Sequence, residues 1–297
     1  MITRRNFIKS GILTLASGMS AAGYARFIEP KWLEVTHKQV NFSSKFTSSF
    51  RLLHLSDFQT SKWLPFSYID RTLNLSLSTD LSHLETAIDL SLTTQPDLIC
   101  LTGDFIGTKV PDFEEYRRIL QKLSDFAPTF ACLGNHDGGS WAIKHNGYPD
   151  TSMMHRLLKE SGIVCLQNAV QQVTILKQSF YIVGLGDLWA EEFEPEKAFS
   201  QLSPIPNKPV IVLSHNPDCK KLIKEYSWDL MLCGHTHGGQ FVMPILGTTP
   251  FAPVRDHRFV TGLHTWQEHQ IHITRGIGNV KGVRFNCRPE ISVLEIQ

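Results

Sequence analysis

The sequence predicts an α/β fold in which a two-sheet β-sandwich carries helices on its outer faces. Short apolar runs alternate along the chain with segments of helical periodicity, an order typical of βαβ units. Residues 170–188 and the C-terminal third hold strand-like runs without clear helices between them, and we assign these runs to further strands of the sandwich. The 297 residues are 42% hydrophobic and 19% charged, so the chain can bury a full core as one large domain.

The first 25 residues differ in character from the rest of the chain. The pair Arg4-Arg5 precedes a mildly apolar stretch at residues 11–22 and a small-residue end at Ala25. This order is that of a secretory signal, and the paired arginines are typical of the twin-arginine route. We expect either export to the periplasm or the outer membrane-facing side, or an anchor in the inner membrane. A basic, flexible terminus is the alternative interpretation.

After this terminus we expect a linker and edge segment at residues 26–49 and a single domain at residues 50–297. Short apolar runs bounded by turn-forming residues indicate the strands of this domain. They lie at residues 52–55, 98–101, 130–133, 163–166, 172–176, 180–185, 210–213, 228–233, 270–274 and 291–296. A turn around Lys177 joins two of them into a hairpin.

Four segments between these strands have apolar residues at helical spacing, and we expect helices there. In the first of them Leu84, Ile88 and Leu92 lie on one face. The four helices span residues 81–92, 113–126, 153–159 and 217–226. Two loops, at residues 138–151 and 244–258, have the length of insertions that border a functional site.

The charge and the cysteines exclude some classes of protein. A formal net charge of +1 and the absence of a basic, aromatic-interleaved stripe predict no nucleic acid partner, and we expect a monomer. The six cysteines contain no Cys-x-x-Cys pair, and Cys100, Cys132 and Cys233 lie inside apolar runs. We therefore expect most cysteines to be packing residues, although export would permit disulfides.

Side chains that bind metals follow five of the predicted strands. In Gly234-His235-Thr236-His237 the two imidazoles are two positions apart, so both rings can point into one cavity. The other four strands end in Asp57, in Asp104, in Asn135 with His136, and in His215. Because open α/β sheets gather their sites at the carboxyl ends of the strands, the sequence predicts a metal centre at that edge.

In this order the clusters resemble the motif set of the calcineurin-like metallophosphoesterases. They are Asp57-Phe58-Gln59, Gly103-Asp104, Gly134-Asn135-His136-Asp137, His215 and Gly234-His235-Thr236-His237. The twin-arginine start, Gly186-Asp187-Leu188-Trp189 and Ser214-His215-Asn216-Pro217-Asp218 further resemble the YaeI-type branch of bacterial phosphodiesterases. The match runs from about residue 51 to the C-terminus. It implies the four-layer fold of that superfamily, a β-sandwich flanked by helices.

The resemblance implies a hydrolase of phosphodiester or pyrophosphate bonds with two divalent metal ions and a bridging hydroxide as the nucleophile. Carried over residue by residue, Asp57, position 59, Asp104 and His237 hold the first ion, and Asp104, Asn135, His215 and His235 hold the second. Asp104 is the bridge. His136 matches the catalytic histidine, which protonates the leaving oxygen or stabilises negative charge on the phosphoryl group. Asp137 is the expected partner that orients its ring.

Gln59 departs from the family pattern, which has a histidine at this position. An amide oxygen is a neutral, hard donor that suits manganese or magnesium better than zinc. We therefore expect manganese, with magnesium, iron or zinc as alternatives. Three outcomes stay open: Gln59 coordinates directly, it holds a water in the ligand position, or the first site is weak. His54 is no substitute, because its offset from Asp57 points it to the opposite face of the strand.

Arg275 is the best cationic candidate for holding a substrate phosphate, because a planar guanidinium pairs well with phosphate oxygens. A surface salt bridge is its alternative role. Asn168 and Asp187 also lie at strand ends on the expected side of the site. We assign both to turns or to the positioning of ligands.

Two functions from different classes fit these features. A metal-dependent phosphoric ester hydrolase is favoured by the complete second metal site. The alternative is a metal-poor, non-catalytic member of the fold that acts as an interaction scaffold, which only Gln59 supports. Related branches split the pyrophosphate of UDP-2,3-diacylglucosamine in lipid A biosynthesis, and a membrane-proximal terminus is compatible with such an amphiphilic substrate. Candidates for an acyl groove are Trp63, Phe66, Trp141, Trp189 and Phe251, with core packing as the alternative.

Overall fold

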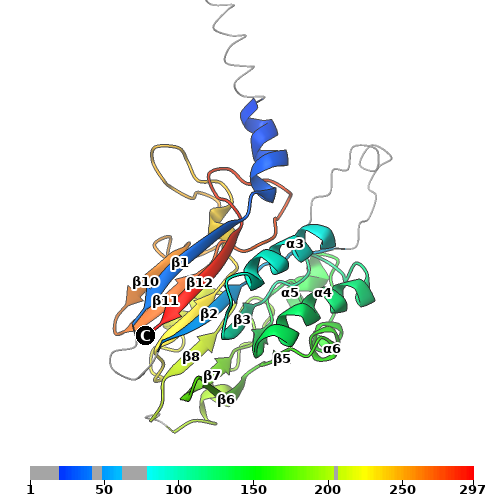
Figure 1. Cartoon of the computed structure of the whole chain (residues 1–297). Helices are drawn as coiled ribbons and strands as arrows, with labels where there is room; N and C mark the ends of the chain where they lie inside the picture. Colours follow the sequence, from blue (N-terminus) through cyan, green and yellow to red (C-terminus); the bar gives the residue numbers. More distant parts are fainter. Residues whose placement is uncertain (1–19, 42–48, 62–78, 204–206) are drawn as a thin grey trace, which may run out of the picture.

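The computed structural model describes residues 20–41, 49–61, 79–203 and 207–297 (Figure 1). The arginine pair, Trp63 and Phe66 lie outside the described residues. Within the described ranges, no helix combines the length and the apolar content that crossing a membrane requires.

Two six-stranded sheets form the centre of the fold (Figure 1). The first sheet has the strand order β1 (Glu34–Val40), β12 (Glu290–Ile296), β2 (Phe50–Leu55), β3 (Leu98–Thr102), β4 (Thr129–Cys132) and β5 (Val164–Cys165). The second has the order β10 (Gly262–Trp266), β11 (His269–Ile273), β9 (Leu230–Cys233), β8 (Val210–Leu213), β7 (Gln178–Gly184) and β6 (Ala169–Ile175). Strands β2 to β5 run parallel to one another, and so do β7, β8, β9 and β11. Each parallel set therefore places its carboxyl ends at one edge of its sheet.

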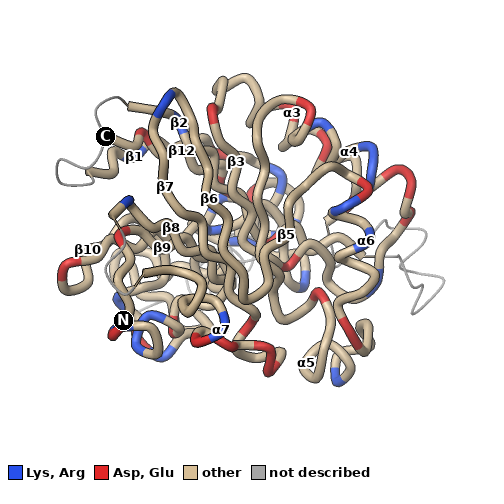
Figure 2. Tube along the Cα trace, turned by 90° about the horizontal axis from the view of Figure 1, so that it is seen from below, with Lys and Arg blue, Asp and Glu red and all other residues tan. Residues whose placement is uncertain are grey.

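Helices cover the outer faces of the sandwich. The helices α3 (Leu81–Leu92), α4 (Phe113–Phe126) and α6 (Ser152–Glu160) pack on the first sheet (Figure 1). The helix α7 (Pro195–Phe199) packs on the second. The shorter elements in the connections are α5 (Ser140–Lys144), η1 (Tyr24–Ile28), η2 (Glu29–Lys31), η3 (Pro217–Lys221) and η4 (His237–Gly239). Figure 2 shows acidic and basic residues side by side on α3 and α4, where the Lys122 amine lies 2.8 Å from Glu85 and 2.7 Å from Asp89.

Three apolar clusters hold these four layers together. Because successive side chains of a strand point to opposite faces, Leu53 of β2 packs under the helices of the first sheet, whereas Leu52 packs between the two sheets. In β8, Leu213 lies in the cluster between the sheets and Val212 in the cluster under α7. Strands buried on both faces read as continuous apolar runs, which is why the sequence predicts them well. All six cysteines are free, and all except Cys165 are buried, as expected for packing residues.

Two of the predicted helices have the predicted bounds, since residues 81–92 and 113–126 coincide with α3 and α4. An aspartate precedes each of them, and its carboxylate accepts from a backbone N–H in the first turn: Asp80 from His83 and Asp112 from Glu115. The expected helix at residues 217–226 is shorter and ends as a 3-10 helix at residue 221. There the indole Nε1 of Trp228 donates to the Ile223 carbonyl oxygen, and this bond closes the segment as a turn.

Strand β10 was not predicted, and β1 was expected only as part of the linker and edge segment at residues 26–49. Each lies at one edge of its sheet and pairs with one neighbour, β1 with β12 and β10 with β11. Edge strands keep polar and charged residues that protect them from pairing with other chains. The continuous apolar run that marks a central strand is therefore missing from both.

Candidate metal centre

Six polar side chains from five strand ends converge at one edge of the two sheets. From the first sheet come Asp57 after β2, Asp104 after β3 and Asn135 after β4; from the second come His215 after β8, and His235 and His237 after β9. All six are buried. The structure therefore brings together the side chains that the sequence places at these strand ends.

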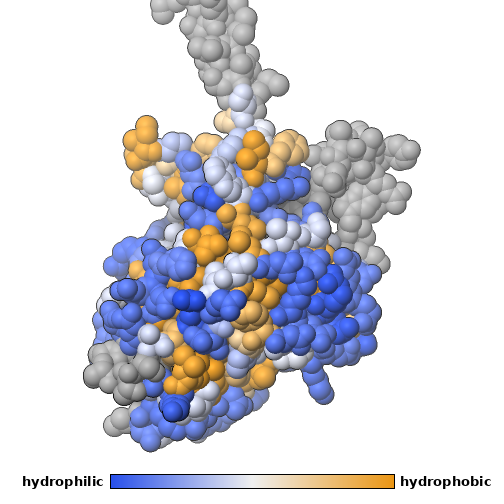
Figure 3. Space-filling view, in the orientation of Figure 1, coloured by the Kyte–Doolittle hydropathy of each residue, from blue (hydrophilic) through white to orange (hydrophobic). Residues whose placement is uncertain are grey.

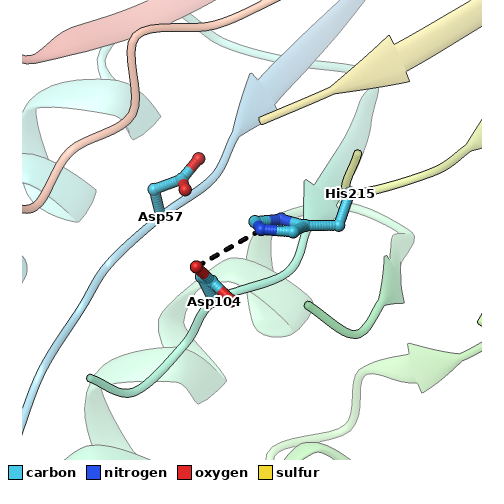
Figure 4. A group of neighbouring side chains, drawn as sticks. All are labelled: Asp57, Asp104 and His215. Carbon is cyan, nitrogen blue, oxygen red and sulfur yellow. Dashed lines mark ion pairs between the residues drawn. The ribbon is translucent and has the colours of Figure 1, made fainter. Parts of the chain in front are cut away.

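The carboxylates of Asp57 and Asp104 and the ring of His215 form the middle of this group (Figure 4). Their ligand-type atoms all lie within 4.8 Å of one another, and Nε2 of His215 is 3.3 Å from Oδ2 of Asp104. Nδ1 of His215 lies 2.7 Å from the carbonyl oxygen of Thr102, to which it donates. Because Nδ1 is engaged by the backbone, Nε2 is the ring atom that faces the carboxylates, and it would bind a metal in its deprotonated form.

The two histidines of the β9 turn face different parts of the site. Nε2 of His237 lies 3.3 Å from Oδ1 of Asp57. Nδ1 of His235 instead lies 3.2 Å from Nε2 of His215, while the backbone N–H of His235 donates to both Asp57 oxygens at 3.1 Å. This division agrees with the resemblance, which implies that the two imidazoles serve different ions.

His136 is held at the open side of Asp104. Its backbone N–H donates to Oδ1 of Asp104 at 2.9 Å, and its ring Nδ1 donates to the carbonyl oxygen of Gly107 at 2.6 Å. Its Nε2 atom is 3.9 Å from Oδ2 of Asp104, and its side chain is 16% exposed. The ring is therefore fixed on its Nδ1 side and can exchange a proton with a bound substrate at Nε2.

Five of the seven predicted ligand residues have a left-handed backbone. Their φ angles are 54° at Asp57, 50° at Gln59, 55° at Asp104, 69° at His235 and 50° at His237. Residues with a Cβ atom rarely adopt this region, and each such position costs about 1–3 kcal/mol. Strain of this kind clusters at functional sites, where the surrounding structure holds it in place.

Two glycines make room for the carboxylates. A Cβ atom on Gly134 would lie 2.3 Å from Oδ1 of Asp104, and one on Gly234 would lie 2.2 Å from Oδ2 of Asp57. Any other residue would push the loop away from the carboxylate. The glycines of the motifs thus allow the β4 and β9 loops to approach the two acids.

Asp137 has a different role from the expected one. Its Oδ2 accepts from the backbone N–H groups of Asp104 and Gly134 at 2.9 and 2.8 Å, and its Oδ1 accepts from those of Phe105 and Ile106 at 2.8 and 3.3 Å. The ring of His136 is oriented by a backbone carbonyl and not by this carboxylate. The expectation that Asp137 orients His136 is therefore wrong; Asp137 fastens the β3 and β4 loops to each other.

The guanidinium of Arg275 is already paired with two carboxylates. Its Nε lies 3.0 Å from Glu290 and its Nη2 lies 2.7 Å from Glu34. Of the two roles considered for this residue, the structure shows the salt bridge and does not show a guanidinium free to hold a phosphate. β1 carries Glu34, so the interaction depends on a strand that the sequence did not reveal.

A second arginine, Arg284, is fully buried beside the centre and gave no signal in the sequence. Its guanidinium donates to the carbonyl oxygens of Arg275 at 2.8 Å, Cys287 at 3.1 Å and His237 at 3.4 Å. Burial lowers the pKa of this guanidinium. Arg284 thereby joins the loop after β11 to the backbone of His237.

Gln59 lies beside the expected bridge. Its side chain is buried, and its Nε2 donates to Oδ2 of Asp104 at 2.6 Å. The amide nitrogen thus contacts the expected bridge, whereas a metal would take the amide oxygen. His54 lies elsewhere, as expected: its Nδ1 is 2.9 Å from Nδ1 of His272 in the interior of the sandwich.

Asn168 and Asp187 organise turns near the site. Asn168 Oδ1 accepts from the backbone N–H groups of Gly186 and Glu194 at 2.9 and 3.1 Å. Asp187 Oδ1 accepts from those of Trp189 and Ala190 at 2.7 and 2.9 Å. These contacts are the turn-forming role that the sequence indicated.

Burial and charge set the protonation of the centre. Burial raises the pKa of Asp57 to about 7. Burial acts in the same direction on Asp104, but the charge of His215 outweighs it and holds the pKa of Asp104 below its ordinary range. Burial lowers the pKa of His235 to about 3 and that of His237 well below its usual value. Both histidines of the turn are therefore neutral near pH 7, which is the form that binds a metal.

The donor set fits divalent cations. Within the described part of the chain, three buried atoms of the centre have no hydrogen-bond partner: Oδ1 of Asn135, Nε2 of His235 and Nδ1 of His237. A buried polar atom without a partner costs about 1–3 kcal/mol, so such a group needs a physical reason. Buried carboxylates with neutral imidazole and amide donors are the combination that divalent metals take in proteins.

Aromatic side chains and a cavity flank the centre. The ring of Trp141 lies 4.3 Å from that of His136, and the ring of Trp189 lies 4.3 Å from that of His235. A cavity of about 540 Å³ lies beside His237, and Phe251 is among its lining residues. The three described aromatic residues proposed for an acyl groove therefore lie at the site or at this cavity.

Comparisons with known proteins agree with this geometry. The family described as calcineurin-like phosphoesterase matches residues 50–239. The chain is 38% identical to phosphodiesterase YaeI of Escherichia coli (strain K12), over 100% of both chains. It is 27% identical to UDP-2,3-diacylglucosamine pyrophosphatase LpxG of Chlamydia trachomatis, over 97% of this chain and 98% of that one. It is 29% identical to the uncharacterized metallophosphoesterase YkuE of Bacillus subtilis, over 100% of this chain and 98% of that one.

Proposed function

Because the chain belongs to the calcineurin-like phosphoesterase family, and is thus a metal-dependent hydrolase of phosphoester bonds, we propose that it cleaves a phosphodiester or pyrophosphate at a dinuclear centre. The observation that carries this proposal is the buried group of Asp57, Asp104 and His215, surrounded by donor atoms that lack partners. When bound, two divalent cations would supply Lewis-acid activation of the phosphoryl group. We propose manganese, because the amide of Gln59 favours a hard ion.

The proposed ligands divide into two sets that share Asp104. Asp57 and His237, with Gln59, belong to the first ion, and Asn135, His215 and His235 to the second. The contacts support this division, because His237 lies against Asp57 whereas His215 lies against Asp104 and His235. Gln59 contacts Asp104, and we therefore place it in the first set. It would bind the ion either directly or through a water.

His136 is the proposed proton donor to the leaving oxygen. Its Nδ1–H is engaged by Gly107, so the second proton of an imidazolium sits on Nε2, the atom that faces Asp104 and the open side of the site. A positioned general acid contributes about 10²–10⁴-fold to such reactions. The ring of Trp141 packs against that of His136 and helps to hold it in place.

The test measures hydrolysis of bis(p-nitrophenyl) phosphate by the manganese-loaded protein. We expect His136→Ala to lower kcat by about 10²–10⁴-fold without loss of bound manganese. His145→Ala, which removes an exposed ring stacked on Trp141 at 3.7 Å, is the matched control and should retain activity. Absence of turnover with every divalent metal tried, or equal kcat values for the two variants, would contradict the proposal.

For the substrate we propose an amphiphilic nucleotide sugar, such as UDP-2,3-diacylglucosamine. Two observations support it: the similarity to LpxG over nearly the whole chain, and the largely apolar cavity beside His237. The assay compares kcat/KM for this nucleotide with that for a generic phosphodiester. A nucleotide that is cleaved no faster than the generic ester rules the substrate out and leaves the hydrolytic centre unaffected.

The N-terminal residues support a further proposal, which is export by the twin-arginine route or anchoring at the inner membrane. Arg4 and Arg5 followed by an apolar stretch are its basis. A reporter fused after Ala25 and followed by cell fractionation tests it. Replacement of both arginines by lysine should leave the reporter in the cytoplasm if the route is used, whereas unchanged fractionation would exclude that route.

A further inference from the structure

Three chain segments form an apolar end of the molecule beside the metal centre. They are residues 24–32, 241–251 and 280–288, which we call the apolar end. Of the fourteen large apolar side chains that are exposed within the described ranges, eight belong to these segments. Figure 3 shows apolar surface on this end, around the place where η1 projects. Such a concentration on a soluble protein surface marks an interaction site.

Defined contacts hold the three segments together. The backbone N–H of Arg284 donates to the carbonyl oxygen of Ala25 at 3.0 Å, and the guanidinium of Arg26 donates to that of Gly282 at 2.8 Å. The ring of Phe285 stacks on that of Phe241 with centroids 5.4 Å apart. The apolar end is therefore one structural unit and not a set of independent loops.

The tip of this unit presents two aliphatic side chains to solvent. A turn closed by bonds from Met243 to Thr248 and from Gly247 to Met243, each 2.9 Å long, leaves Ile245 105% exposed and Leu246 68% exposed. Ile245 also has φ 71°, a left-handed conformation that is unfavourable for a β-branched residue. Neither feature stabilises the isolated protein, so both point to a ligand that contacts the tip.

The charges around the apolar end are basic. Lys31 and Lys281 are exposed, Arg288 is half-buried, and Glu29, the single acid in the three segments, is buried. Residues 1–19 continue from this end of the described structure, and their sequence holds three more basic residues and no acid. Apolar side chains bordered by cations match the chemistry of an anionic lipid surface.

We propose that the apolar end docks on an anionic lipid bilayer, with Ile245, Leu246 and Phe251 entering the acyl region and Lys31 and Lys281 contacting the headgroups. Phe251 is 74% exposed and also lines the cavity beside His237. Docking in this orientation turns the mouth of that cavity toward the membrane. A phosphoester with lipid chains can then pass from the bilayer to the metal centre, a step that rests on the proposed function.

Insertion of the tip is tested with tryptophan as a depth probe. Full-length Leu246→Trp is mixed with phosphatidylethanolamine and phosphatidylglycerol vesicles that carry brominated acyl chains. We expect its fluorescence to be quenched well beyond that of the parent protein, and the effect to vanish with phosphatidylcholine vesicles. Leu176→Trp is the matched control: Leu176 is 58% exposed in the turn before β7, at the opposite end of the sheet from the centre, and should behave as the parent. Equal quenching of both variants would overturn the proposal.

A second pair of variants separates docking from catalysis. Ile245→Asn with Leu246→Ser should lower the vesicle partition constant at least tenfold relative to Leu176→Ser, and both proteins should hydrolyse soluble bis(p-nitrophenyl) phosphate at the parent rate. An unchanged partition constant refutes docking through this end. A concentration-dependent dimer that only the tip variant loses shows that a second copy of the chain covers it, which also overturns the proposal. If neither protein hydrolyses bis(p-nitrophenyl) phosphate but the partition constants differ as expected, the proposed function is wrong and the docking proposal is unaffected.

Discussion

The substitution Asp137→Asn tests how the β3 and β4 loops are held under the metal centre. The carboxylate accepts four backbone hydrogen bonds, two on each oxygen. An asparagine places an NH₂ group against two backbone N–H donors in either orientation, so two buried donors lose their acceptor. At about 1–3 kcal/mol each, we expect a loss of about 2–6 kcal/mol in the free energy of unfolding.

Asp187→Asn is the matched control for this loss. Oδ1 of Asp187 accepts two backbone bonds, while Oδ2 is buried and has no partner within the described residues. The asparagine nitrogen can occupy the position of Oδ2, so we expect a change below about 1 kcal/mol. Both substitutions replace a buried carboxyl group by an amide, and the difference between them isolates the hydrogen bonds.

Urea denaturation at pH 7 gives the free energy of unfolding, and metal analysis gives the manganese content of each variant. We expect Asp137→Asn to lose manganese as well as stability, because it fastens the backbone that carries Asp104. Equal unfolding free energies for the two variants would refute the assigned role of Asp137. Loss of activity in Asp137→Asn with stability and manganese content intact would restore a direct role in the reaction.

Three further predictions concern residues around the centre. Gln59→His should raise the zinc affinity of the first site, measured by metal analysis after dialysis against zinc; an unchanged zinc content would show that Gln59 lies outside the ligand set. Burial would raise the pKa of Glu290, but the charge of Arg275 outweighs burial and holds that pKa below its ordinary value of 4.5. As the pH falls, Glu290 therefore takes up its proton in the unfolded chain before it does so in the folded protein. The stability from Glu290 is therefore full above about pH 4.5 and lost as the pH falls. Glu290→Gln should accordingly show a smaller fall in unfolding free energy between about pH 5 and pH 3 than the parent, and a fall of equal size would contradict the pairing. Arg275→Ala should lower the melting temperature while leaving KM for a soluble phosphodiester within about twofold; a large rise in KM would show that the guanidinium reaches substrate.

The elements that the sequence predicts most closely are those whose signal is local. Helices α3 and α4 follow from apolar residues on one face and an aspartate at the start, all within a few positions of each other. β10 was missed and β1 was expected only as part of an edge segment, because these two edge strands lack the apolar run of a central strand. The helix expected at residues 217–226 was predicted too long. Its apolar spacing gives no sign of the bond from the Trp228 indole to the Ile223 carbonyl oxygen, because Trp228 lies beyond the helical pattern.

For the candidate site, the order of the motifs along the chain was enough to predict which side chains converge. Parallel strands place their carboxyl ends together, which brings the residues after β2, β3 and β4 to one sheet edge and those after β8 and β9 to another. The resemblance implies that these two edges face each other, and the contacts between Asp104 and His215 and between Asp57 and His237 agree with it. The division of His235 and His237 between two parts of the centre came from the resemblance, and the contacts to His215 and Asp57 agree with it. The apolar end was not predicted from the sequence, because three segments that lie far apart along the chain build it.

By itself the sequence predicted the fold class, the apolar layers and the polar side chains at the strand ends, because each strand, helix and motif is marked by residues within a few positions of one another. Only the tertiary structure decided which partner each polar group has. Arg275 meets Glu34, 241 positions away, because β1 and β12 lie side by side in the sheet. Asp137 accepts from the β3 loop, and not from the ring of its neighbour His136, because β3 and β4 are adjacent. Such pairings depend on strand order, and no local pattern in the chain reports that order.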